Sequence, residues 1–264
     1  MEKIEYQKHF ELEEKFWWFR GRRKILMSIL RSRLKARKNL SILDAGCGAG
    51  YNLNMYESLG LVFGFDFSEE ALYFCRKRGL SRLAQADLRA LPFKSGAFDI
   101  ISVLDVLSHE SIRDDVEVLK DIGGRLKEGG YLLLADNALE MLRSPHDRAY
   151  HVRERYRRKT LRPRVEAAGF RILRTSYFNF FLFPVIFLVR LAERTGRAKA
   201  GSVQSDLKAA PRLLNAVLGG ILGFEALLSR RISLPWGSSI ICLAVKSSGG
   251  KEGLSLPSNS SDKA

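Results

Sequence analysis

The segment from Ile42 to Gly50 constrains the fold of this chain more than any other part of the sequence. It reads Ile-Leu-Asp-Ala-Gly-Cys-Gly-Ala-Gly, in which two branched apolar residues and an acid precede glycine at every second position. Glycine adopts backbone conformations closed to other residues and lets the chain approach a ligand closely. The pattern predicts a strand that ends in a tight loop before a helix. An ordinary strand–helix turn is the alternative.

Further apolar runs repeat this strand-then-acid arrangement. Leu61–Asp66 reads as a second buried strand. Its terminal acid follows the first glycine by about 20 residues, where a nucleotide-binding sheet places a carboxylate for ribose hydroxyls. Ser68, with two acids after it, predicts the start of a helix. Later units of the same kind lie at 84–88, 98–103 and 131–135.

These segments resemble, in order, the motifs of the class I S-adenosylmethionine (SAM) methyltransferases. The glycine loop is similar to motif I of that family, which is distinct from the G-x-G-x-x-G of dinucleotide-binding loops. Phe98-Asp99 and the run Leu126–Gly130 resemble its strand 4 and pre-strand 5 signatures. The resemblance spans residues 40–136. It implies a SAM-dependent methyltransferase with an α/β fold, built on a seven-stranded, mostly parallel, Rossmann-like sheet with helices on both faces.

The resemblance also implies a cofactor site for SAM. By this resemblance, Asp66 would bind the ribose hydroxyls, and Asp87 would accept a hydrogen bond from the adenine amino group. The cofactor-binding residues implied in this way are Asp44, Gly46, Cys47, Gly48, Gly50, Asp66, Phe67, Asp87, Leu88 and Leu104.

An aromatic and basic element precedes the glycine loop, with the sequence Phe16-Trp-Trp-Phe-Arg-Gly-Arg-Arg23. Four consecutive aromatic residues cannot all face one helix core, so some should pack on the sheet domain while others line a cleft. The element resembles a Trp-Trp-Phe-x-x-Arg segment of methyltransferases found with glycan and lipid biosynthesis. Guanidinium groups bind oxyanions, so Arg20, Arg22 or Arg23 is expected to reach the cofactor carboxylate or an anionic substrate. A docking helix with exposed arginines and an interfacial membrane anchor are the alternatives. We expect Trp18, Arg20 and Arg23 to bind substrate.

The segment after the fifth strand resembles a His-Asp…His-x-x-Arg-Tyr element that covers the active site in this subgroup. On that basis His151, Arg155 and Tyr156 are candidates for substrate contact. A basic helix from Arg153 to Glu166 that packs on the sheet is the alternative.

Methyl transfer to a hydroxyl is helped by a general base that titrates near the working pH. His109 and His151 are therefore the predicted catalytic residues, with Asp105 a weaker candidate. His109 follows the fourth strand, at the sheet edge where ligands bind in this type of fold. A histidine at a helix start without a catalytic task is the alternative reading.

The chain is expected to comprise an N-terminal helical lid or docking segment at 1–39, a methyltransferase domain at 40–246 and a disordered tail at 247–264. An apolar helical insert at 178–238 separates the last two strands. Its two apolar stretches, broken by Pro184 and by Gly219-Gly220, are too short to span a bilayer comfortably. Each is followed by arginines. They fit interfacial helices at an anionic membrane, a cap over a greasy pocket, or a dimer interface.

The 264-residue chain carries a net charge of +15, concentrated in the regions 20–38 and 148–174. Nucleic acid, anionic lipid, an acidic substrate or a solvated basic surface would each account for it. The three cysteines form no CxxC pair, which favours a reducing cytoplasm over disulfides or a structural zinc. No metal site is predicted.

Taken together, the sequence predicts methyl transfer to a small-molecule, lipid or glycan-linked acceptor, at oxygen. The expected location is the cytoplasm, with peripheral contact at the inner face of the membrane and a homodimer as open alternatives. The alternative functions are an RNA methyltransferase and a non-catalytic SAM-binding subunit. Nucleic acid is disfavoured because Leu104-Asp-Val-Leu lacks the Pro-Pro-aromatic loop of amino-directed base methyltransferases, and no cysteine follows a proline.

Overall fold

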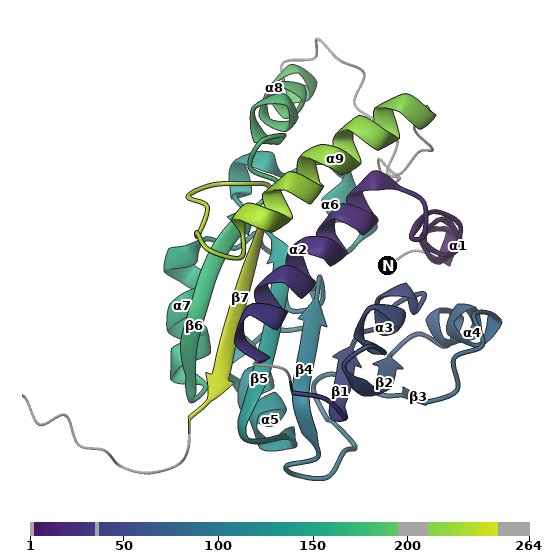
Figure 1. Ribbon diagram of the computed structural model, residues 1–264, viewed down its shortest axis with the longest axis vertical. Coiled ribbons are helices and arrows are strands. Elements are labelled where there is room, and N and C mark those ends of the chain that lie inside the picture. The colour runs from purple at the N-terminus through teal and green to yellow at the C-terminus, as the bar shows by residue number, and fades with distance from the viewer. Residues whose placement is uncertain (1–2, 35–36, 195–210, 248–264) are drawn as a thin grey trace, which may run out of the picture.

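A single mixed β-sheet forms the centre of the computed structural model, which describes residues 3–34, 37–194 and 211–247 (Figure 1). The strand order is β3-β2-β1-β4-β5-β7-β6, and β7 alone runs antiparallel to its neighbours. The strands are β1 (Leu40–Ala45), β2 (Gly60–Asp66), β3 (Leu83–Gln85), β4 (Phe98–Leu104), β5 (Leu126–Asn137), β6 (Phe170–Phe178) and β7 (Ser239–Lys246). The predicted α/β fold is confirmed.

The central strands are apolar on both faces because helices cover both faces. In β1, Ile42 and Leu43 are both fully buried but belong to different hydrophobic clusters, one on each side of the sheet. Ile100 and Ile101 of the neighbouring β4 divide in the same way. Parallel strands covered on both faces read as continuous hydrophobic runs, which is why these segments show no polar alternation.

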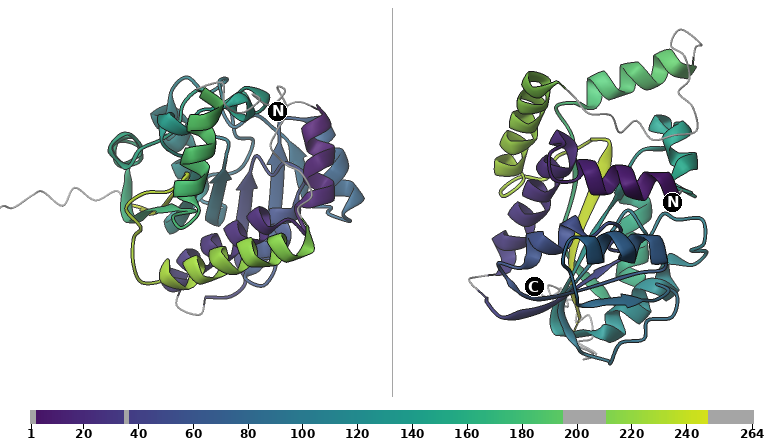
Figure 2. Two further views of the ribbon diagram at one scale, coloured as in Figure 1. Left: turned by 90° about the horizontal axis from the view of Figure 1, so that it is seen from above. Right: turned by 90° about the vertical axis from the view of Figure 1, so that its right-hand side faces the viewer.

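Two pairs of helices form the outer layers (Figure 2). Helices α2 (Trp17–Leu34) and α9 (Arg212–Leu228) pack on one face, and α5 (Asp115–Arg125) and α7 (Arg158–Ala167) pack on the other. The contact of α2 with α9 requires a glycine, because a Cβ at Gly21 would lie 2.4 Å from two side-chain atoms of Leu222. The N-terminal segment and the insert before β7 are thereby joined, although they are about 200 residues apart in sequence.

The remaining helices are α1 (Lys3–Leu12), α3 (Tyr51–Tyr56), α4 (Glu69–Lys77), the 3₁₀ turn η1 (Glu140–Leu142), α6 (Pro145–Ala149) and α8 (Phe183–Arg194). Helix α4 begins at the predicted cap, where the Ser68 hydroxyl accepts from the Ala71 N–H at 3.4 Å. Helices α1, α6 and α8 lie at the upper end of the molecule in Figure 1, beyond the carboxyl ends of the parallel strands. This is the edge at which such sheets bind ligands.

The insert between β6 and β7 contains helices α8 and α9. Pro184 does not break a helix, because it occupies the second position of α8, where its missing N–H costs no helical hydrogen bond. Gly219 and Gly220 lie within a continuous α9. In the described ranges, no helix is long and apolar enough to cross a membrane. The predicted disordered tail falls almost entirely outside the described residues.

Candidate functional site

The loop after β1 has glycines in the left-handed backbone region. Gly46, Gly48 and Gly50 all have positive φ, of 77°, 56° and 87°. A Cβ at Gly46 would lie 2.4 Å from Val106, and one at Gly50 would lie 2.7 Å from the Cys75 sulfur. A Cβ at Gly48 would meet no atom within 4 Å. The backbone is therefore packed on two sides and open at the middle glycine.

The carboxylate of Asp66 is fixed beside this loop at the end of β2. Its Oδ2 accepts from the Gly48 N–H and its Oδ1 from the Ser68 N–H, both at 2.9 Å. Burial raises the pKa of this carboxyl group. Each oxygen retains acceptor capacity, so the carboxylate can bind two further hydroxyl groups.

A cavity of about 370 Å³ opens in front of the loop. Eight of the ten predicted cofactor residues line it: Gly46, Cys47, Gly48, Asp66, Phe67, Asp87, Leu88 and Leu104. Asp87 holds Arg89 in an ion pair at 2.5 Å, and hydrogen bonds from Arg89 lower the pKa of Asp87. Four carboxylate residues (Glu13, Asp66, Asp87 and Asp105) and two arginines (Arg22 and Arg89) line this cavity, and the excess of acids suits a ligand with a positive charge.

Asp44 and Gly50 are not among the residues that line this cavity. Asp44 is 1% exposed, and its Oδ1 accepts from the Ser102 hydroxyl at 2.6 Å. Burial raises the pKa of Asp44 to about 7. Both residues lie away from the cavity surface, so direct contact with a cofactor does not fit their positions.

The N-terminal helices form part of the wall of this cavity. Tyr6 and His9 of α1, Glu13 just after it, and Phe19 and Arg22 of α2 also line the cavity. A second cavity of about 280 Å³ adjoins it, and all four aromatic residues from Phe16 to Phe19 line this one. The two cavities share five lining residues: His9, Phe19, Arg22, Asp105 and Tyr150. This shared set marks the boundary between two compartments.

Arg22 is the arginine that reaches this boundary. It is 6% exposed, and its Nη1 lies 2.5 Å from Asp105, a residue with φ 59° at the end of β4. Its Nε and Nη2 are buried without a hydrogen-bond partner. Buried donors of this kind are costly unless something binds them, so they mark a site for a carboxylate or another oxyanion.

The two neighbouring arginines, which we predicted as substrate ligands, lie elsewhere. Arg20 is exposed and lines neither cavity. Arg23 donates to the Glu13 carbonyl at 2.5 Å and lies over the Tyr51 ring. The helical period explains this arrangement, because only one of these positions can face the sheet edge. Trp18 does line the second cavity, where its ring stacks on Phe178.

Several hydrogen-bonded polar groups meet at His9, on the boundary between the two cavities. The sequence alone did not indicate a functional role for His9. His9 Nδ1 lies 3.1 Å from Glu13 Oε1, and its Nε2 lies 2.8 Å from the Tyr150 hydroxyl. The same hydroxyl lies 3.3 Å from Glu5 Oε2. The spacing of His9 and Glu13, four residues apart just before the aromatic run, is the signal that could have identified this pair.

The two histidines predicted as catalytic occupy different environments. His109 lines only the larger cavity, and its Nδ1 lies 2.8 Å from the Ser111 hydroxyl. Burial lowers the pKa of His109. His151 lines neither cavity, and its Nδ1 lies 3.0 Å from Glu110. Neither ring is at the boundary between the compartments.

Arg155 and Tyr156 have structural contacts. Arg155 lines the second cavity, but its guanidinium binds the buried Asp147 at 2.8 and 3.1 Å and the Ala138 carbonyl at 3.1 Å. Tyr156 is fully buried, and its hydroxyl donates to Asp115 at 2.7 Å. The prediction that Tyr156 contacts substrate is wrong for this geometry, because its ring is fully buried in the hydrophobic core.

A missed polar group in the second cavity is Asn179, at the end of β6 with φ 63°. Its Nδ2 donates to Ser238 at 2.7 Å, whereas its Oδ1 is buried without a partner. The oxygen can accept a hydrogen bond from a bound ligand. Across the described residues, no group of three or more His, Cys, Asp or Glu side chains could hold a metal ion.

Comparison with known proteins agrees with this geometry. Residues 43–134 match the family model described as "Methyltransferase domain". A malonyl-[acyl-carrier protein] O-methyltransferase of Enterobacter lignolyticus is 31% identical over 140 residues, which cover 52% of this chain and 51% of that protein. A tRNA U34 carboxymethyltransferase of Pectobacterium carotovorum is 31% identical over 111 residues, covering 39% of this chain and 33% of that protein. The chain thus spans about half, or less, of the length of these relatives.

The fold has counterparts among solved structures. A putative methyltransferase in complex with the Haloferax volcanii Trm112 activator aligns with a TM-score of 0.57 and 17% identity, over 89% of this chain and 92% of that one. The glycine loop, the anchored Asp66 and the acidic cavity fit SAM, whose sulfonium carries positive charge and whose ribose presents two hydroxyls. We conclude that residues 43–134 form a methyltransferase domain of the class I SAM-dependent type, with SAM as the cofactor of that domain.

Proposed function

We propose that this protein transfers the methyl group of SAM to an oxygen of a small-molecule, lipid or glycan-linked acceptor that binds in the second cavity. The observation that carries this proposal is the shared lining of the two cavities at His9, Arg22, Asp105 and Tyr150. A cofactor in one compartment and an acceptor in the other would meet at this boundary, where reaction depends on alignment of the two groups.

The lining of the second cavity indicates the chemistry of the acceptor. Phe16 to Phe19 supply an aromatic wall on one side. Arg22 and Asn179 contribute the unpartnered buried donors and acceptor described above. These groups suit a molecule with a large apolar part, an anionic group and a hydroxyl.

The described side chains can hold the cofactor and move a proton. When bound, SAM supplies a methyl group made electrophilic by its sulfonium. Asp66 would hold the ribose hydroxyls of the cofactor, and the free donors of Arg22 are left for the anionic group of the acceptor. In the tautomer that donates Nδ1–H to Glu13, Nε2 of His9 can accept the Tyr150 proton, which Tyr150 can also donate to Glu5 Oε2 at 3.3 Å. Tyr150 can then take the proton of an acceptor hydroxyl as its own proton passes to His9.

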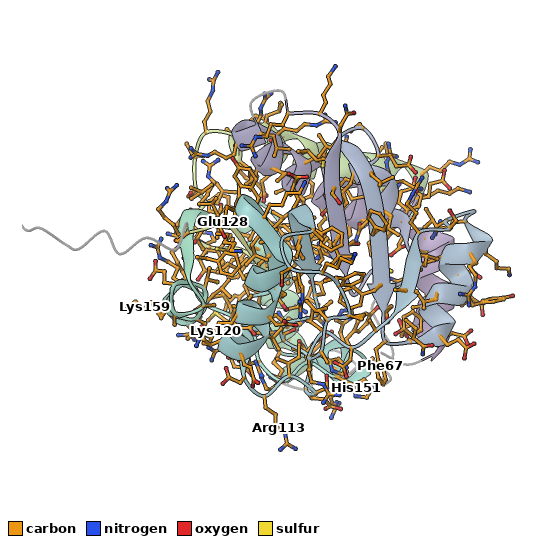
Figure 3. All side chains as sticks on the ribbon, turned by 90° about the horizontal axis from the view of Figure 1, so that it is seen from below. Phe67, Arg113, Lys120, Glu128, His151 and Lys159 are labelled. Atoms are coloured by element: carbon orange, nitrogen blue, oxygen red, sulfur yellow. The ribbon has the colours of Figure 1, made fainter. Side chains whose placement is uncertain are left out.

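The RNA alternative rests on the basic charge, and internal contacts account for much of that charge in the region 148–174. Arg153 and Arg164 bind the buried Asp115 at 2.7 and 2.6 Å. Arg155 binds Asp147, as described above. Other cations, such as Lys120 and Lys159, extend outward from separate helices on the α5–α7 side (Figure 3). This distribution favours a small acceptor over a nucleic acid.

The proposal is tested with SAM carrying a radiolabelled methyl group. Purified protein is incubated separately with a lipid extract, a soluble metabolite extract and bulk tRNA. Label in a base-labile or ether product from the lipid or metabolite fraction supports the proposal. Label in tRNA alone would favour the RNA alternative, and SAM binding without transfer to any fraction would favour a non-catalytic subunit.

A further inference from the structure

Exposed apolar side chains gather at one end of the molecule. Twelve of the sixteen large apolar side chains that are exposed in the described part of the chain lie between Phe181 and Trp236. Large contiguous apolar patches on a protein surface mark interaction sites. Nine of the twelve lie on α8 and α9 and are called the apolar end below: Val185, Leu188, Val189, Leu191, Leu213, Leu214, Val217, Phe224 and Leu227.

Helix α9 divides cleanly into a packed face and an exposed face. Leu222 and Ala226 are buried against α2, whereas Leu213 is 79% exposed. The single acid of the helix, Glu225, is buried and accepts from the backbone N–H groups of residues 179 and 180 at 2.5 and 2.9 Å. The outer face of α9 therefore carries no charge from 213 to 228.

Helix α8 connects this surface to the acceptor compartment. Val185, Leu188 and Val189, spaced three and four residues apart, share its exposed face. Ile186 and Arg190 line the second cavity. One helix thus presents apolar side chains outward and contributes to the wall of the acceptor site.

Cations surround the apolar end. Arg212 precedes the first leucine of α9, Arg230 and Arg231 follow α9, and all three arginines are exposed. Lys24 on α2 lies alongside α9, with its ammonium 3.8 Å from a Cβ placed on Gly223. Among the described residues from 179 to 246, the acids are Glu193, which pairs with Arg190, and the buried Glu225.

We propose that the apolar end docks on the surface of an anionic lipid membrane, with its leucines in the interfacial layer and the surrounding arginines and lysine at the headgroups. An apolar centre with a cationic rim is the pattern of interfacial membrane binding. Contact between two copies of this face would instead bring like charges together. Docking would place the wall of the acceptor cavity beside the bilayer; resting on the proposed function, this selects lipid-borne acceptors among those it names.

Co-sedimentation with vesicles tests the docking. The full chain should bind phosphatidylcholine vesicles that contain phosphatidylglycerol, should bind pure phosphatidylcholine vesicles far less, and should dissociate as salt is raised. The double variant Leu213→Asp/Leu227→Asp should lose at least about tenfold in vesicle affinity. Both leucines are exposed, so the fold should persist. Tyr73→Asp, at an exposed position of α4, is the matched control and should bind as the parent does.

Three outcomes would overturn the proposal: no binding to either vesicle, equal binding by the double variant and the parent, or light scattering that shows a dimer dissociated by the double variant. SAM affinity measured without vesicles separates this test from the proposed function. Loss of vesicle binding with intact SAM binding would remove only the membrane contact.

Discussion

Replacing Asp66 with alanine should weaken SAM binding by about 30- to 150-fold. The carboxylate is fixed by two backbone N–H groups, so its free acceptor positions are preorganised. Hydrogen bonds to a charged group contribute about 1.5–3 kcal/mol each. Taking the two ribose hydroxyls together at about 2–3 kcal/mol, because the cavity is open to water, gives that loss in affinity. Isothermal titration calorimetry with SAM measures it directly.

The matched control is His151→Ala, because His151 lines neither cavity. It should bind SAM as the parent does. Circular dichroism of both variants establishes that they remain folded. Equal SAM affinity in Asp66→Ala and the parent would refute the assignment of the ribose site, and so would a loss in His151→Ala as large as that in Asp66→Ala.

Three further predictions concern other described groups. Tyr150→Phe should leave SAM affinity nearly unchanged but lower methyl transfer by about 10- to 100-fold in the label assay, because it removes the hydroxyl beside His9. Tyr156→Phe should instead lower the free energy of unfolding by about 1–3 kcal/mol in urea titrations and spare SAM binding, since its buried hydroxyl bonds to Asp115. Burial raises the pKa of Asp44 to about 7, so the folded state holds this proton more tightly than the unfolded chain does. Its contribution to stability is lost as pH rises from about 4 to about 7, and the melting temperature of Asp44→Asn relative to the parent should therefore increase over that range.

The cofactor site could be predicted because its determinants are local. The order of apolar runs, the glycine spacing and Asp66 all follow from short segments, and the structure brings most of these residues to one cavity. Loop conformation was harder to predict. Tyr156 and Arg155 lie in a segment whose side-chain directions depend on Asp115 and Asp147, and nothing in the spacing shows which charges are buried together.

The second cavity is formed by contacts between segments whose spacing in the sequence does not reveal them. Its lining comes from the N-terminal helices, the loop after β5, the start of the insert and the residues before β7. The pairing of His9 with Tyr150 joins positions 141 residues apart. Arg22 and Arg23 are adjacent and chemically identical, and only the rotation of α2 on the sheet distinguishes the one that reaches Asp105.

The shared boundary of the two cavities has a consequence for turnover. Because α1 contributes His9 to both cavities, the same helix would cover the cofactor and the proposed acceptor. Exchange of either ligand past this cover would expose the other to solvent. Release of the spent cofactor and of the methylated product would then share one opening motion, and mutations at the contact of α1 with α4, where Tyr6 packs near Phe74, would alter the rate of both steps together.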